Sequence, residues 1–168
     1  MPASIRASLD AHIAVIHALT PMTADIARFA ERAWRCLAGG GRLFWIGNGG
    51  SAADCQHLAA ELVGRFERER RGLAAIALTT DSSVLTSVSN DYGFESVFAR
   101  QVEALCRPGD MLVGLSTSGN SANVLRAMEM AAALGIDRVG LTGGSGGRLR
   151  EQCELCLVVP SDNTARIQ

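Results

Sequence analysis

The chain has 168 residues, of which 48% are hydrophobic and 20% are charged, a size and balance typical of one globular domain. Sixteen basic and seventeen acidic residues give a formal net charge of −1, which argues against non-specific nucleic-acid binding because that needs a strongly cationic surface. No apolar run reaches the roughly 18–20 residues of a membrane-spanning helix.

The beginning of the chain and the cysteines point to a reducing compartment. Residues 1–9 lack the apolar segment of a secretory signal, so we expect a cytoplasmic protein whose five cysteines are reduced. Two of them form the pair Cys153-x-x-Cys156. Because no second pair accompanies it, we interpret these two as ordinary core thiols rather than as a metal or redox site.

The first forty residues have the pattern of two helices. Ile5, Leu9, Ile13 and Ile16 recur at helical spacing, which predicts a helix over 4–19. A second helix follows Pro21, runs to about residue 37 and ends at the glycines of 39–41. Two helices ahead of the first strand need a surface to cover, and a partner subunit is one candidate.

From Arg42 onward, short apolar runs alternate with amphipathic segments. This alternation predicts a parallel sheet that is covered by helices on both faces. We therefore expect an α/β fold in a single domain over 1–168, with N-terminal helices in 1–38 and the sheet in 42–168. The predicted strands are Leu43–Ile46, Ala74–Leu78, Met111–Leu115, Arg138–Leu141 and Leu155–Val159, and the predicted helices are 51–66, 82–89, 94–106, 121–134 and 147–152.

Three polar loops follow predicted strands, where open α/β sheets bind their ligands. They are 47–51, 79–81 with its continuation to 90–93, and 116–121. The third, Ser-Thr-Ser-Gly-Asn-Ser, combines four hydroxyls with a glycine and a following helix, which favours a phosphate site. Neither a P-loop nor a complete dinucleotide motif is present. The later glycines of 143–147 are expected to be a flexible helix entry without ligand contact.

The helix predicted over 51–66 carries a second group of polar residues. His57, Glu61 and Arg65 are spaced i, i+4 and i+8, so they lie along one helix face. This spacing fits an exposed pair of His57 and Glu61 with the cationic Arg65 nearby. It also fits a carboxylate base beside a histidine or a metal. Two ligands at this spacing do not by themselves make a zinc site.

Taken together, several strings resemble one family. GNGGSAADCQHLAAELVGRF, LTTD, NDYG, STSGNS and TARIQ, in this order, resemble the bacterial phosphoheptose isomerases, which are sugar-isomerase (SIS) domain proteins, over essentially 1–168. The resemblance implies a three-layer α/β/α sandwich with a five-stranded parallel sheet, and N-terminal helices that pack a homotetramer. It also implies an enediol isomerisation of sedoheptulose 7-phosphate to D-glycero-D-manno-heptose 7-phosphate, the first step of heptose supply for lipopolysaccharide.

The same resemblance implies the site residues. Glu61 matches the catalytic carboxylate, and His57, Glu61 and Gln168 match positions that bind one zinc ion per subunit in some members, together with a further histidine. The zinc would act as a Lewis acid or brace the helix. The implied substrate-binding residues are Asn48, Gly49, Gly50, Ser51, Glu61, Arg65, Asn90, Asp91, Ser116, Thr117, Ser118, Ser121 and Gln168.

One departure from the family keeps alternatives open. In the family a Glu follows the Ile-Gln pair and a His lies about eight residues later, but the sequence ends at Gln168, so we expect the natural chain to continue. The alternatives are a non-catalytic SIS protein that binds the replication initiator and a sugar-phosphate sensor. The initiator-binding relative has Arg where this chain has Ser118, and NDYG also favours the enzyme. An aminosugar isomerase would usually have a duplicated SIS arrangement.

Overall fold

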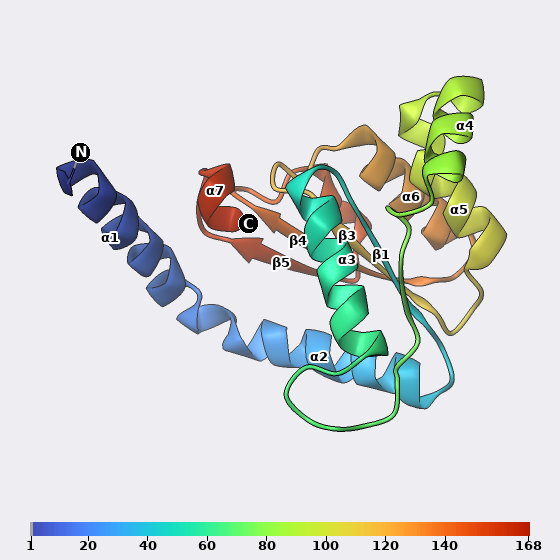
Figure 1. Ribbon diagram of the computed structural model, residues 1–168, viewed down its shortest axis with the longest axis horizontal. Coiled ribbons are helices and arrows are strands. Elements are labelled where there is room, and N and C mark those ends of the chain that lie inside the picture. Colours follow the sequence, from blue (N-terminus) through green and yellow to red (C-terminus); the bar gives the residue numbers. More distant parts are fainter. Residues whose placement is uncertain (1) are drawn as a thin grey trace.

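Five apolar segments of the chain form one parallel sheet in the order β2-β1-β3-β4-β5 (Figure 1). The computed structural model describes residues 2–168, with side chains from Ser4 onward; Met1, where the predicted domain begins, lies outside the described residues. In β1 and β3 every residue is buried, as expected for central strands covered on both faces. The strands are β1 Leu43–Gly47, β2 Ala75–Ala77, β3 Met111–Leu115, β4 Asp137–Gly143 and β5 Leu155–Val159.

Helices cover both faces of this sheet and confirm the predicted three-layer α/β/α sandwich. One apolar cluster packs α5 and α6 against Phe44, Ile46 and Leu112, and a second packs α2 and α3 against Leu43 and Trp45. The predicted helix at 147–152 is a short 3₁₀ helix, Arg148–Gln152. The α-helices are α1 Pro2–Ala18, α2 Thr23–Ala38, α3 Gly50–Val63, α4 Ser82–Tyr92, α5 Val97–Leu105, α6 Ala122–Ala133 and α7 Thr164–Ile167, with further 3₁₀ turns at Thr20–Met22 and Phe94–Ser96.

The two N-terminal helices have different surroundings. Helix α2 lies against the sheet, where the ring of Phe29 meets Trp45 edge-on. Helix α1 projects away from the sandwich (Figure 1), and its apolar side chains Ile5, Leu9 and Ile13 are exposed. Within the described residues 2–168, no helix is both long and apolar enough to span a membrane.

Candidate functional site

The loop that follows β3 presents hydroxyls at the start of α6. The hydroxyls of Ser116 and Ser121 lie 2.9 Å apart and share a hydrogen bond, so the Ser121 hydroxyl is engaged across the loop instead of capping the helix. The start of α6, where the helix dipole is positive, therefore borders the loop without a cap from Ser121. This is the arrangement that a phosphate group needs.

A second loop, which contains the glycines of 143–147, packs against the loop after β3. The backbone N–H of Gly143 donates to Thr117 O at 3.1 Å, and that of Leu149 donates to Gly119 O at 2.9 Å. Gly119 has a φ of +67°, and a Cβ there would overlap the carbonyl oxygen of Gly146. The glycines of 143–147 were predicted to be a flexible helix entry. They instead pack closely against residues 116–121, which we call the serine loop.

The side chain of Asn120 strengthens the same contact. Its amide nitrogen donates to Ser118 O at 2.9 Å, and its carbonyl oxygen accepts from the backbone N–H of Arg148 at 3.1 Å. Its backbone N–H donates to the Ser118 hydroxyl at 3.2 Å. These bonds hold Ser118 within the loop, so the predicted phosphate cradle is built largely by backbone and local polar contacts.

The loop after β1 is tied to α6 by a pair of amides. Asn48 Nδ2 donates to Asn123 Oδ1 at 2.9 Å, and Asn123 Nδ2 donates back to Asn48 Oδ1 at 2.8 Å. Asn123 is only 3% exposed, and its Oδ1 also accepts from the N–H of Val124. Asn123 was not among the predicted site residues; its position two residues after the Ser-Gly-Asn-Ser string was the available signal.

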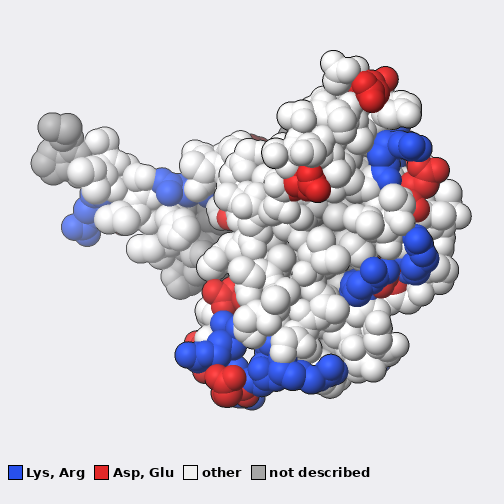
Figure 2. All heavy atoms as spheres, turned by 45° about the vertical axis from the view of Figure 1, so that its right-hand side comes forward, with Lys and Arg blue, Asp and Glu red and all other residues white. Residues whose placement is uncertain are grey.

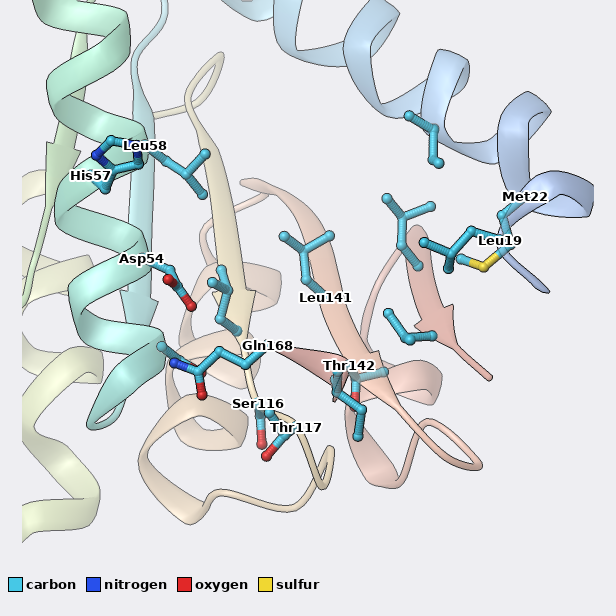
Figure 3. Close-up of a pocket in the computed structure, with 16 residues that line it drawn as sticks. Leu19, Met22, Asp54, His57, Leu58, Ser116, Thr117, Leu141, Thr142 and Gln168 are labelled. Carbon is cyan, nitrogen blue, oxygen red and sulfur yellow. The ribbon is translucent and has the colours of Figure 1, made fainter. Parts of the chain in front are cut away.

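The loop after β3 and helix α3 border a cavity of about 350 Å³ (Figure 3). Ser51, Ser116, Thr117 and Gln168 supply polar groups to its wall. A Cβ at Gly50 would overlap the side-chain amide of Gln168, so glycine there lets the end of the chain approach the start of α3. The rest of the wall is mostly apolar: Leu19, Met22, Ile26, Leu58, Leu115, Leu141, Leu157, Val159 and Ile167.

Asp54 is a carboxylate in this wall that sequence reasoning missed. It lies three residues after Ser51 and three before His57, and all three side chains border the cavity. Figure 3 shows Asp54 projecting from α3 on the side of Gln168. The i, i+3 spacing along α3 was the available signal, because it places these residues on one helix face.

Glu61 continues that face one turn beyond His57. The His57 Nε2 to Glu61 Oε1 distance is 3.7 Å, and the side chains of His57 and Glu61 are 73% and 31% exposed. At a rise of 1.5 Å per residue, Glu61 is about 15 Å from Ser51 along the helix. Glu61 is thus outside the sixteen residues that line the cavity (Figure 3), and its role as the base stays a prediction.

The predicted zinc ligands do not converge within this chain. Gln168 lies against Gly50, whereas Glu61 is eleven residues further along α3, about 16 Å at the helical rise. Among the residues that the structure describes, no group of three or more His, Cys, Asp or Glu could hold a metal ion. The described residues therefore do not bring the implied ligands together, zinc binding stays a prediction, and we derive no catalytic step through a metal.

Three other predicted site residues lie apart from the cavity. Asn90 and Asp91 are in the last turn of α4, exposed, with Asn90 Nδ2 donating to Asp91 Oδ1 at 2.9 Å; in Figure 1 α4 is well separated from α7. Arg65 follows the end of α3, and its Nε lies 3.4 Å from Glu69 Oε2. Their contact with substrate stays a prediction.

The paired cysteines carry little thiolate. Burial is the main cause that raises the pKa of Cys153 to about 12 and that of Cys156 to about 11. Because the thiolate is the form that binds metals and attacks disulfides, these thiols have the chemistry of core residues.

The fold and the serine-lined site define a SIS-domain protein. A family model described as "SIS domain" matches residues 9–143. A phosphoheptose isomerase from Roseiflexus sp. (strain RS-1) is 59% identical over 164 residues, which cover 98% of this chain and 82% of that protein. The chain belongs to the SIS-domain family and, within it, to the phosphoheptose isomerases, and it is therefore an isomerase.

Solved structures agree with this assignment. The phosphoheptose isomerase from Neisseria gonorrhoeae superimposes with a TM-score of 0.94 at 42% identity, covering 99% of this chain and 89% of that one. The phosphoheptose isomerase from Francisella tularensis also superimposes with a TM-score of 0.94, at 40% identity, and the match covers 98% of this chain and 88% of that one. The predicted fold and family are thus confirmed.

Proposed function

We propose that the protein interconverts sedoheptulose 7-phosphate and D-glycero-D-manno-heptose 7-phosphate and so supplies heptose for lipopolysaccharide in the cytoplasm. The observation that carries this proposal is the serine loop at the start of α6, with Ser116 and Ser121 bonded to each other beside a cavity that also contains Ser51 and Gln168. Such a loop suits a terminal phosphate, and the close relatives are phosphoheptose isomerases.

In this proposal the loop anchors the phosphate and leaves the open-chain sugar extended from it. Thr117 and Ser118 add hydroxyls to the cradle, and Asn48, Gly49 and Gly50 form the neighbouring loop over the start of α3. Anchoring the far end of the substrate lowers the entropy cost of bringing the reacting carbons to a base.

The chemical step is a proton transfer between adjacent carbons. A carboxylate removes a proton from C1 of the ketose, the electron pair forms the C1–C2 double bond of a cis-enediol, and the C2 oxygen gains a proton. The carboxyl group then returns its proton to C2 while the C1 hydroxyl loses one, which gives the aldose. We assign the carboxylate to Glu61, with His57 3.7 Å away as its neighbour.

We also propose that the protein assembles as a homotetramer through its N-terminal helices. Ile5, Leu9, Ile13 and Ile16 are each more than half exposed on α1, and an apolar stripe of this kind is typical of a helix that packs against another. Light scattering of the purified protein measures the assembly, and a monomeric mass would contradict it.

The activity is tested directly with the sugar phosphate. The purified protein should convert sedoheptulose 7-phosphate to the aldose heptose 7-phosphate, followed by NMR of the anomeric protons, and should incorporate solvent deuterium at C2. Binding without turnover would favour the sugar-phosphate sensor instead. Binding of the replication initiator with no affinity for the sugar phosphate would favour the non-catalytic partner protein.

A further inference from the structure

The guanidinium group of Arg70 joins the loop after α3 to the end of that helix. Arg70 Nη1 donates to Leu62 O at 2.9 Å, to Gly64 O at 3.2 Å and to Arg71 O at 3.0 Å. Its Nη2 donates to Glu61 O at 2.7 Å. A single side chain thus reaches the backbone of the last turn of α3 and of the loop on either side of it.

These bonds replace an ordinary helix cap. The last carbonyl groups of a helix have no partner within it, and many helices satisfy them by a left-handed glycine. Gly64 has φ −80° and ψ −112°, so α3 does not end in that way. Gly64 N–H bonds Ala60 O, and Leu73 N–H bonds Leu62 O, while Arg70 supplies the donors to Glu61 O and a second donor to Leu62 O.

The charge of Arg70 suits the same place. A cation near the carboxyl end of a helix is stabilised by the helix dipole, and the planar guanidinium can serve several carbonyls at once. The neighbouring charges do not form a basic patch, since Glu67 and Glu69 alternate with the arginines. Figure 2 shows acidic and basic side chains intermixed at the lower end of the molecule, where this loop lies in Figure 1.

One of the four residues whose carbonyl groups Arg70 binds, Glu61, is also the proposed base. Glu61 is in the last turn of α3, so its side chain keeps its place beside His57 only while that turn stays helical. We propose that Arg70 is a positioning residue for the isomerisation, closing the last turn of α3 so that the Glu61 carboxylate is fixed for proton transfer. This inference rests on the proposed function, in which Glu61 is the base.

Steady-state kinetics with sedoheptulose 7-phosphate test the inference on Arg70→Ala and Arg70→Lys. The matched control is Arg68→Ala, since Arg68 is an exposed arginine of the same loop. We expect kcat to fall by about 10-fold or more in Arg70→Ala, because small displacements of a reacting group are costly, while KM stays within about twofold of the wild-type value. Arg70→Lys should also be slow because one ammonium cannot bind four carbonyls, and Arg68→Ala should match the wild type.

Two measurements separate positioning from general loss of structure. Millimolar guanidinium ion should restore part of the kcat of Arg70→Ala, and hydrogen exchange of the Gly64 amide should be faster in that variant than in Arg68→Ala. In the Glu61→Gln background, Arg70→Ala should lower kcat no further, because a residue that acts through Glu61 has nothing left to position.

The outcomes distinguish this inference from the function on which it rests. If Glu61→Gln lowers turnover but Arg70→Ala leaves kcat unchanged, only the positioning role is overturned. An equal loss of kcat from Arg70→Ala with and without the Glu61 carboxylate would overturn it as well. Wild-type turnover in Glu61→Gln would instead show that the assignment of the base is wrong.

Discussion

The two ends of the candidate site are built by different means. At the phosphate end, the Ser116–Ser121 loop rests on the glycines of 143–147 through backbone hydrogen bonds and close contacts. At the far end of α3, the turn that carries Glu61 is closed by the side chain of Arg70. The first construction uses several backbone contacts, so replacing one side chain does not remove it. In the second, the hydrogen bond to Glu61 O comes from the Arg70 side chain, which a single substitution removes.

The largest effect is expected at the carboxylate end. Glu61→Gln keeps the size of the side chain and removes the base, so turnover of sedoheptulose 7-phosphate should fall by about 100-fold or more. Calorimetric binding of the sugar phosphate should change little, because the phosphate end is untouched. Asp54→Asn is the matched comparison, since Asp54 is the carboxylate that borders the cavity; a larger loss of turnover there would reassign the base to Asp54.

The next effect is expected at the phosphate end. Gly119→Ala adds a Cβ at a φ of +67° that overlaps Gly146 O, so the serine loop must shift and KM should rise by about 10-fold. Gly40→Ala is the control, because its φ of +85° imposes similar backbone strain while its Cβ would meet open space. Equal kinetics in the two variants would show that the support from 143–147 does not position the loop.

A smaller effect is expected where the two loops are joined. Asn123→Ala removes one partner of the amide pair, and we expect the free energy of unfolding to fall by about 1 kcal/mol, near the lower end of the cost of an unpaired polar group. Asn48 is only partly buried and can turn toward water, whereas the N–H of Val124 also loses its acceptor, so the loss should not be smaller than this. Urea unfolding of Asn48→Ala, Asn123→Ala and the double variant measures it; fully additive losses would mean that the pair has no coupling energy.

The smallest effect lies outside the site, at the ion pair of Arg138 and Glu154. Partial burial acts to raise the pKa of Glu154, but hydrogen bonds from the Arg138 side chain and backbone outweigh it, and the pKa is lowered from 4.5. The native state therefore gains stability above the unfolded pKa and loses it as the pH falls through the folded one. Urea unfolding between pH 3 and 7 should show a slightly shallower loss in Glu154→Gln than in the wild type; identical slopes would contradict the lowered pKa.

Much of the architecture could be predicted because it depends on local patterns. The apolar runs that form β1 and β3 are buried on both faces. A fully apolar run between amphipathic helices is typical of a central strand of a parallel sheet. The hydroxyls of Ser116 and Ser121 were likewise visible as a loop at a helix start. The short α7 was not predicted, since one turn leaves no periodicity to detect.

The sequence by itself determined the apolar strands and the helices between them, the serine loop and the face of α3 that carries His57 and Glu61, because these depend on the residue pattern within each segment; the strand order came from the tertiary structure. Only the tertiary structure decided that Asn123 binds Asn48, that Arg70 closes α3 and that Gln168 lies too far from Glu61 to share a metal within this chain. The physical reason is that these contacts join residues far apart in the chain or across a loop. Their distances are set by the packing of whole elements and leave no periodic trace in the sequence.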